Sequence, residues 1–257
     1  MSSSYIGSKW RKTLPLLGEA ETKRWVPETA KLTKQRLRVM LRKYDTVYVK
    51  PEFGTFGVGV MRTARLADGS WELRFGTARR VYESFDRMYG ALSRMKKGKS
   101  YLVQRGIPLL KHNGRSFDIR VMVQKNLQKK WEATGVIGRV AAKGKVVTNY
   151  HSGGTPMPLE TLLKPYLSRD GIKGQIGSLK RKGVKIAKVL QRRFPGIREI
   201  GVDVGMDSRF DPWVLEVNTR PDPYIFRKLP DKSVVRKVLR YARSYGRIKA
   251  KGSVKRK

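Results

Sequence analysis

Oxygen-bearing side chains alternate with apolar residues on two neighbouring stretches near the end of this 257-residue chain. Asp203 stands between two valines, and one valine separates Glu216 from Asn218. Residues i and i+2 of a strand share a face, so we expect strands over 200–205 and 212–218, with Asp203 opposite Glu216 across a hairpin. Carboxylate and amide oxygens suit Mg²⁺, and burying an acid without a partner is costly. The pattern predicts a metal site; solvent-facing polar strands are the alternative.

Composition removes several kinds of chemistry. The chain has no cysteine, which excludes disulfides, thiolate nucleophiles and zinc–cysteine sites. It has only two histidines, so a histidine-rich metal site is also excluded. Five Trp, eleven Tyr and eight Phe, with 39% apolar residues, indicate a folded core rather than disorder.

The net charge of the chain indicates the kind of partner it could bind. There are 58 Lys and Arg against 20 Asp and Glu, a net charge of +38. Such a surface favours contact with polyanions. The candidate partners are nucleic acid, an anionic envelope polymer, an acidic peptide and a membrane surface. A basic surface without a dedicated partner is the alternative. No apolar run reaches the length of a membrane span, and residues 1–10 lack a signal core. We therefore expect a cytoplasmic protein.

A glycine-rich loop follows the predicted strand 46–50. Gly54, Gly57 and Gly59 would let backbone N–H groups approach an anion closely, and Lys50 would add a point charge to a phosphate. A glycine-rich hairpin with a lysine reaching solvent is the alternative. The loop is no Walker motif, since no Gly-Lys-Ser/Thr follows it.

Asp118 and Arg120 share a face of the predicted strand 117–124, and Arg139 lies on the next strand. A guanidinium group suits forked recognition of phosphate or carboxylate. A structural ion pair between strands accounts equally well for these residues. His151 is not assigned as a general base, because no acid or nucleophile stands near it in the sequence.

Periodicity and turn signals predict the remaining elements. Thr33 is expected to cap the main part of the first helix, and residues 232–257 hold many Lys and Arg and no acid. The predicted helices are 28–43, 84–95, 159–167, 175–194 and 234–245. The other predicted strands are 58–66, 70–75, 101–104, 131–142 and 145–149.

The order of these motifs resembles the ATP-grasp superfamily, and in particular its YheC/YheD-type, endospore coat-associated group. The likeness spans about Lys9 to Arg220. The segments that carry it are Val26-Pro27-Glu28-Thr29, Tyr48-Val49-Lys50-Pro51, Phe117-Asp118-Ile119-Arg120-Val121, Gly201-Val202-Asp203 and Glu216-Val217-Asn218.

The resemblance implies an α+β fold in which two α+β subdomains grip ATP. It implies an ATP-grasp domain over 1–230, with a glycine-loop subdomain at about 45–105, a metal-binding subdomain at about 106–230, and a basic helix and tail over 231–257. The N-terminal α/β domain of many ATP-grasp proteins is expected to be absent or supplied by another chain.

The resemblance also implies the ligands and their residues, with ATP and Mg²⁺ (or Mn²⁺) as cofactors. Arg120 and Arg139 would contact phosphate or the acyl intermediate, and Asp203, Glu216 and Asn218 would hold the metal. The residues implied to bind nucleotide are Lys9, Lys50, Gly54, Thr55, Gly57, Gly59, Gln104, Arg105, Gly106, Ile107 and Asn149.

The chemistry implied is attack of a carboxylate on the γ-phosphate, followed by displacement of phosphate from the acyl phosphate by an amine or thiol. This needs no protein nucleophile, so the lack of cysteine is no obstacle. The expected function is a ligase for a spore or cell-envelope component, with a non-catalytic ATP-binding protein of the spore coat or cell surface as the alternative. A nucleic-acid binder is supported by charge alone. Arg220 would bind a carboxylate substrate or mark altered activity; the substrates, acidic or polymeric, and the oligomeric state stay open.

Overall fold

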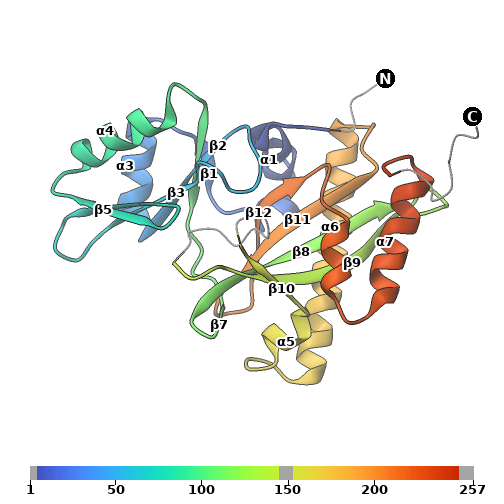
Figure 1. Ribbon diagram of the computed structural model, residues 1–257. Coiled ribbons are helices and arrows are strands. Elements are labelled where there is room, and N and C mark those ends of the chain that lie inside the picture. Colours follow the sequence, from blue (N-terminus) through green and yellow to red (C-terminus); the bar gives the residue numbers. More distant parts are fainter. Residues whose placement is uncertain (1–4, 145–152, 249–257) are drawn as a thin grey trace, which may run out of the picture.

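Two antiparallel sheets lie side by side along the molecule (Figure 1). The computed structural model describes residues 5–144 and 153–248. The first sheet has the order β1-β6-β2-β3-β4-β5, and its strands are β1 (Thr29–Lys31), β2 (Thr46–Pro51), β3 (Met61–Arg65), β4 (Trp71–Phe75), β5 (Ala78–Tyr82) and β6 (Tyr101–Arg105). The second has the order β10-β9-β8-β11-β12 with β7 paired to β8, and its strands are β7 (Lys111–His112), β8 (Arg115–Lys125), β9 (Trp131–Val140), β10 (Thr155–Met157), β11 (Glu199–Met206) and β12 (Pro212–Asn218).

Helices cover these sheets. Two of them, α3 (Lys34–Lys43) and α4 (Phe85–Lys96), pack against the first sheet. The others are α1 (Lys9–Leu17), α2 (Ala20–Lys23), α5 (Leu159–Leu163), α6 (Arg169–Arg193), the 3₁₀ helix η2 (Tyr224–Lys228) and α7 (Lys232–Ser244). Within the described ranges, no helix combines the length and the apolar character needed to cross a membrane.

The first sheet sends alternate residues to opposite faces. Val47 and Val49 of β2 are fully buried in one core with Leu37 of α3 and Leu92 of α4. Because side chains alternate along a strand, Lys50 emerges on the other face, toward the second sheet. The packing of α3 and α4 therefore leaves one face of the first sheet available to build a site.

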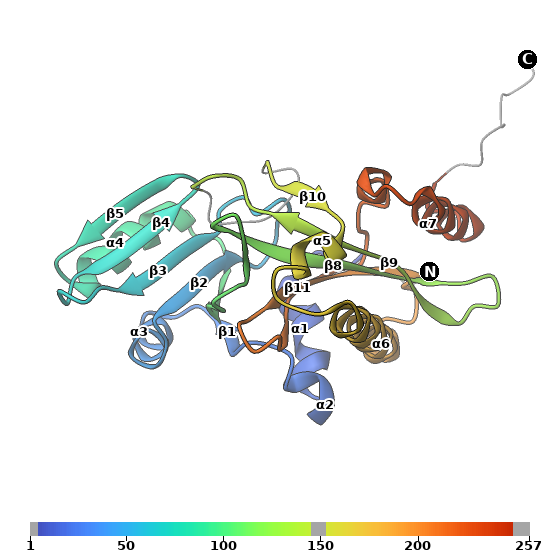
Figure 2. The same cartoon turned by 90° about the horizontal axis from the view of Figure 1, so that it is seen from below.

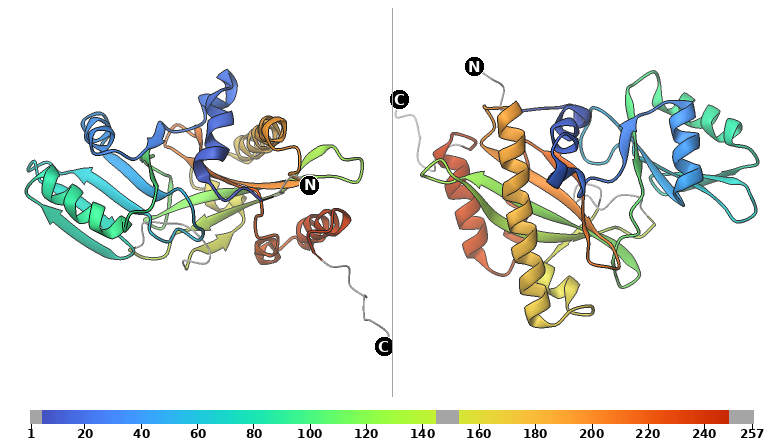
Figure 3. Two further views of the ribbon diagram at one scale, coloured as in Figure 1. Left: turned by 90° about the horizontal axis from the view of Figure 1, so that it is seen from above. Right: turned by 180° about the vertical axis from the view of Figure 1, so that it is seen from behind.

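The second sheet lies between two helical layers (Figures 2 and 3). Val121 and Val123 of β8 pack in the core shared with α6, whereas Met122 between them packs with α7. Gly183 brings α6 close, since a Cβ there would lie 2.9 Å from Val123 Cγ2. The face of the sheet that bears α7 also carries the polar residues of β8, and α7 covers only part of it.

Most of the predicted elements are confirmed, with shifted ends. Thr33 does cap α3, and its hydroxyl oxygen accepts the Arg36 N–H at 3.1 Å. The predicted helix 28–43 is wrong before residue 34. Thr29 instead pairs with Gln104 as the edge strand β1, because the unpaired side of β6 offers backbone hydrogen bonds there. The strand predicted for 145–149 lies outside the described residues.

Three other boundaries were also wrong. The strand predicted for 58–66 begins only at Met61, because the glycine loop extends to residue 60. The helix predicted for 159–167 ends at Leu163. The helix predicted for 175–194 begins already at Arg169, where Ser168 caps it through the Gly171 N–H at 3.2 Å. α1 was not predicted.

Candidate functional site

A cleft lies where the open face of the first sheet meets the second sheet. Its walls come from α1, β2, the loop after β2, β6 and β12. Most of the predicted nucleotide residues meet here. Those that line the cleft, together with acids from β8, β11 and β12, include Lys9, Lys50, Thr55, Gly57, Gln104, Arg105, Ile107, Asp118, Asp203 and Glu216.

Lys9 joins the glycine loop to β12. Ser8 caps α1 and donates a hydrogen bond from its hydroxyl to Glu52 at 2.6 Å, while the Lys9 N–H donates to the Glu52 carbonyl at 2.9 Å. These contacts hold the first turn of α1 against the end of β2. The Lys9 ammonium group then donates to the Gly54 carbonyl at 2.7 Å and lies 3.6 Å from a Glu216 oxygen.

The glycine loop adopts backbone angles that favour glycine. Gly54, Gly57 and Gly59 have φ of 125°, 73° and 76°. At Gly59 a Cβ would lie 2.9 Å from the Tyr101 hydroxyl, so the loop also has no room for a side chain at this position. The loop can therefore turn tightly over the cleft, as expected of a phosphate-binding loop; its contact with phosphate stays a prediction.

Lys50 is a cation in an unfavourable position. Its ammonium group lies among protein atoms and donates to Gln104 Oε1 at 2.5 Å. Burial lowers the pKa of Lys50 to about 8; attraction by Glu216 opposes the shift and repulsion by Lys9 adds to it. A bound anion would relieve this cost, which is what a phosphate-binding lysine requires.

Lys12 is a site residue that sequence reasoning missed. Its side chain is buried, with 5% of its surface exposed, yet among the described residues it makes no hydrogen bond or ion pair. Burial lowers its pKa, against attraction by Glu216 and with repulsion from Lys9. Lys9 and Lys12 are three residues apart on α1 and so share a helix face. That spacing is the signal that could have revealed Lys12.

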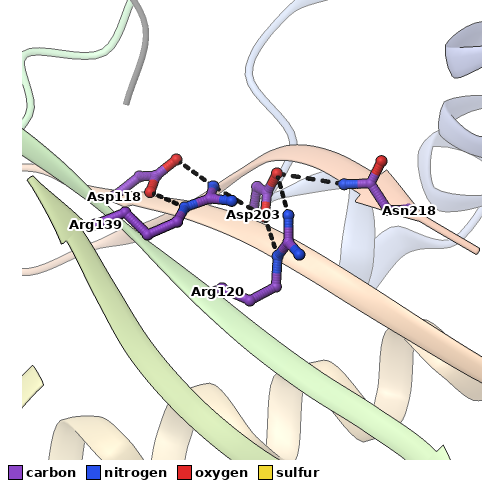
Figure 4. Close-up of polar contacts among 5 residues, drawn as sticks. All are labelled: Asp118, Arg120, Arg139, Asp203 and Asn218. Atoms are coloured by element: carbon purple, nitrogen blue, oxygen red, sulfur yellow. Dashed lines mark hydrogen bonds and ion pairs between the residues drawn. The ribbon is translucent and has the colours of Figure 1, made fainter. Parts of the chain in front are cut away.

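Three strands of the second sheet bring two arginines and two aspartates into one buried network (Figure 4). Arg120 binds both oxygens of Asp203, with Nε–Oδ1 at 2.5 Å and Nη2–Oδ2 at 3.1 Å. Arg139 binds both oxygens of Asp118 at 2.7 and 2.6 Å and reaches Asp203 at 3.1 Å. Gly201 gives Arg120 room, since a Cβ there would lie 3.1 Å from its Cδ. The structural ion pair considered for Arg139 and Asp118 is present.

The network also shifts proton affinities. Burial acts to raise the pKa of Asp203, but the attraction of Arg120 and Arg139 outweighs it, so the pKa is lowered. Burial acts to lower the pKa of Arg139, and here Asp118 and Asp203 outweigh it, so the pKa is raised. Asp203 and Arg139 are therefore both charged near neutral pH.

The predicted metal residues are neighbours. Asp203 stands opposite Glu216 in the β11–β12 register, as expected. Asn218 donates to Asp203 Oδ2 at 3.3 Å, and its amide oxygen points away from that carboxylate (Figure 4). Glu216 instead faces Lys9. In the described ranges, no three His, Asp or Glu residues converge as a ready metal site.

The donor set nevertheless fits a cation that arrives with an anion. Glu216 and Asn218 offer oxygen ligands that suit Mg²⁺. Lys9, Lys12 and Lys50 surround them, and their positive charge would repel a lone cation. A negatively charged polyphosphate would offset that repulsion, so the site fits a metal–nucleotide complex better than a metal alone.

The end of β6 links the two sheets. Gln104 donates to the Leu215 carbonyl at 3.5 Å, and the Arg105 guanidinium group lies between the rings of Tyr44 and Trp213, at 5.0 and 5.2 Å from their centroids. The N–H groups of Arg105 and of the following glycine already donate to backbone carbonyls. Of the four residues predicted to contact adenine, Gln104, Arg105 and Ile107 line the cleft.

The fourth of these residues does not line the cleft. Gly106 packs against Thr46, where a Cβ would come within 2.7 Å of Thr46 Cγ2, so glycine is required for this approach. Asn149 and His151 lie outside the described residues.

Comparison with known proteins adds relatives to this geometry. Endospore coat-associated protein YheD of Bacillus subtilis (strain 168) is 30% identical over 189 residues, a match that covers 71% of this chain and 41% of that protein. The chain thus spans about two fifths of that relative's length. Two crystal structures share the fold at 12% identity, each over 93% of this chain. D-cycloserine synthetase DcsG has a TM-score of 0.58 over 70% of its chain, and the ADP complex of PurK, N5-carboxyaminoimidazole ribonucleotide synthetase, has 0.51 over 52%.

These likenesses confirm the ATP-grasp fold expected from the motifs. A family model described as YheC/D-like ATP-grasp matches residues 1–248. The chain belongs to the YheC/D-like ATP-grasp family.

Proposed function

We propose that the chain is an ATP- and Mg²⁺-dependent ligase that activates a carboxylate as an acyl phosphate and joins it to an amine or a thiol. The observation that carries this proposal is the meeting of Lys9 and Lys50 with Glu216 and Asp203 in one cleft, with the buried Lys12 near Glu216. Buried cations beside metal-binding oxygens suit a metal–polyphosphate. The family assignment supports the same ligand.

Each group then has a defined task. Lys50 and Lys9, with the loop from Gly54 to Gly59, would hold the phosphates, while the strand end near Ile107 would hold adenine. Asp203, Glu216 and Asn218 would hold Mg²⁺, with Mn²⁺ as a substitute. The bound metal would neutralise charge on the phosphates.

The arginines would act on the reacting groups. Arg120 and Arg139 are fixed by carboxylates before any ligand binds, and their guanidinium groups line a cavity next to Glu216. Groups held in place in advance lose little freedom when charge develops. Catalysis would then rest on positioning and charge neutralisation rather than on a protein nucleophile.

A second candidate function is an ATP-binding structural protein, in a spore coat or at a cell surface, without turnover. Two observations favour it. Both oxygens of Asp203 are engaged by guanidinium groups, and the Bacillus subtilis relative is described as endospore coat-associated.

Two measurements separate the candidates. Calorimetric titration with Mg²⁺ and the non-hydrolysable ATP analogue AMP-PNP reports binding, and ADP release in the presence of a panel of carboxylates and amines reports turnover. A ligase gives both signals, and the structural protein gives the first alone. Glu216→Ala should abolish turnover while the melting temperature holds. Asp211→Ala removes an exposed acid of the same hairpin and should change neither; full turnover by Glu216→Ala would refute the metal assignment.

A further inference from the structure

A second cavity opens beyond Glu216, on the side away from the adenine end of the cleft. Its volume is about 320 Å³, within the range of small-molecule sites. It shares Thr55, Asp203 and Glu216 with the cleft, so the two spaces meet at the proposed metal residues. A molecule in the second cavity would therefore have one end beside the reacting groups.

The C-terminal segment supplies one wall of this cavity. After α7 the chain turns at Gly246, which has a φ of 73°, and the Arg247 N–H donates back to the Ala242 carbonyl at 2.8 Å. The Arg247 side chain is then held by Glu199 of β11, whose Oε1 accepts the Arg247 Nε–H at 2.9 Å. In the part of the chain that the structure describes, its side chain has no other hydrogen bond. The terminal nitrogens of its guanidinium group are free to bind a ligand.

Arg220 supplies a second guanidinium group to the same cavity. It follows β12 directly, is exposed, and lines the cavity together with Arg247. Glu199 attracts both arginines, but its second oxygen already accepts the Tyr245 hydroxyl at 2.7 Å. Within the described residues Arg220 has no hydrogen bond or ion pair. Glu199 is thus shared by two cations, which favours a further anion beside them.

The two ends of the cavity differ in chemistry. Asp203, Glu216 and Arg120 line the part shared with or next to the cleft. Arg220 lies four residues after Glu216, and Arg247 is held by Glu199, four residues before Asp203 on β11, so both arginines lie farther along the cavity. Between them the wall is partly apolar, from Pro221, Pro223 and Ile225. Asp222 also lines the cavity, and one of its oxygens accepts the Tyr224 N–H at 2.8 Å, so it serves the turn into η2.

We propose that this cavity is the site for the carboxylate substrate, and that Arg220 and Arg247 recognise a second carboxylate at its far end. The substrate class is a small dicarboxylate, including acidic amino acids. Forked guanidinium groups bind carboxylate through paired hydrogen bonds, and two of them reject a neutral group that leaves them unpaired. This inference rests on the proposed ligase function only for the fate of the first carboxylate.

The test measures binding rather than turnover. Succinate, glutarate and adipate are titrated calorimetrically into the full chain, each beside its own monoamide, with and without AMP-PNP and Mg²⁺. We expect at least one dicarboxylate to bind about tenfold more tightly than its monoamide. Arg220→Ala should abolish that preference and leave AMP-PNP binding unchanged. The matched control Arg236→Ala removes an exposed arginine of α7 and should keep the preference.

Arg247→Lys tests the second arginine and still leaves Glu199 with a hydrogen-bond donor, because lysine can donate to that carboxylate. It should weaken dicarboxylate binding severalfold at an unchanged melting temperature. The inference is overturned if no dicarboxylate is preferred at any of the three lengths, if Arg220→Ala keeps the preference, or if inorganic phosphate binds as tightly as the best dicarboxylate. Dicarboxylate selectivity without AMP-PNP binding would refute the ligase proposal alone, whereas AMP-PNP binding without selectivity would refute this inference alone.

Discussion

Lys50 offers a measurement in which burial, charge and ligand binding can be separated. The pKa of its ammonium group falls from 10.5 to about 8 because burial removes its hydration. That difference corresponds to roughly 3 kcal/mol of penalty on the charged form. Near neutral pH the folded protein carries this penalty, since Lys50 is still protonated there. We expect the penalty to disappear as the group loses its proton.

The sign of the pH effect follows from proton counts. The pKa of Lys50 is about 8 in the folded chain and 10.5 in the unfolded chain, so the unfolded chain holds more protons between these values. The free energy of unfolding therefore rises with pH through this window. From pH 7 to pH 9.5 the wild type should gain about 2 kcal/mol relative to Lys50→Met, which has no titrating group at this position.

Urea unfolding followed by tryptophan fluorescence, at both pH values, checks this number. The variant also loses the hydrogen bond to Gln104, but that loss is the same at both pH values and cancels in the comparison. Lys180→Met, on an exposed site of α6, is the matched control and should follow the wild type. Equal pH dependence in the wild type and Lys50→Met would refute the reasoning.

The same charge should control nucleotide binding in the opposite direction. A phosphate beside Lys50 favours its protonated form and restores the pKa toward 10.5. Affinity for AMP-PNP with Mg²⁺ should therefore fall by up to about 30-fold from pH 7 to pH 9.5. Calorimetry on Lys50→Met should show a weaker complex with a much smaller dependence on pH over this range.

Three further variants test separate parts of the site. Lys12→Met should weaken AMP-PNP binding about tenfold in calorimetry, whereas Lys23→Met on the exposed side of α2 should not. Arg139→Met should lower the urea-derived free energy of unfolding by about 3–5 kcal/mol, because it removes both hydrogen bonds that Arg139 donates to the buried Asp118 and its ion pair with Asp203; a loss below about 1 kcal/mol, typical of a surface pair, would contradict this. Gly59→Ala should cost about 1–3 kcal/mol in the same assay, and more than Gly98→Ala, which has a similar φ of 73° but open space around it.

The strands of the second sheet were predictable because each buried face repeats every two residues. Val121 and Val123 of β8 face α6, and the hairpin between β11 and β12 sets Asp203 opposite Glu216 as expected. Local capping chemistry was equally readable, as at Thr33. Segments without a repeating pattern of apolar residues could not be predicted in this way. Thr29 became a strand because β6 had an unpaired edge, a tertiary fact absent from the local pattern.

The partners of the charged residues could not be read from the sequence. Arg120 and Asp203 are 83 positions apart and meet only because β8 and β11 are neighbours in the sheet. Nothing in the local sequence states that order. Lys12 was missed for a related reason, since a lysine near the start of a short helix is usually solvated, and its burial comes from the tertiary packing of α1, which contacts both β12 and α6.

The arginine–aspartate network would allow one site to be stable without ligands and still accept the proposed metal–nucleotide. Arg139 keeps two hydrogen bonds to Asp118 whether or not Asp203 stays beside it. In the described part of the chain, the only hydrogen-bond partner of the Arg120 side chain is Asp203. If Asp203 turns to a cation, Arg139 remains neutralised and Arg120 is released toward the cavity beyond Glu216. The two arginines are thus not equivalent: Arg139 is the anchor of the network, and Arg120 is the guanidinium group that metal binding would free for a substrate carboxylate.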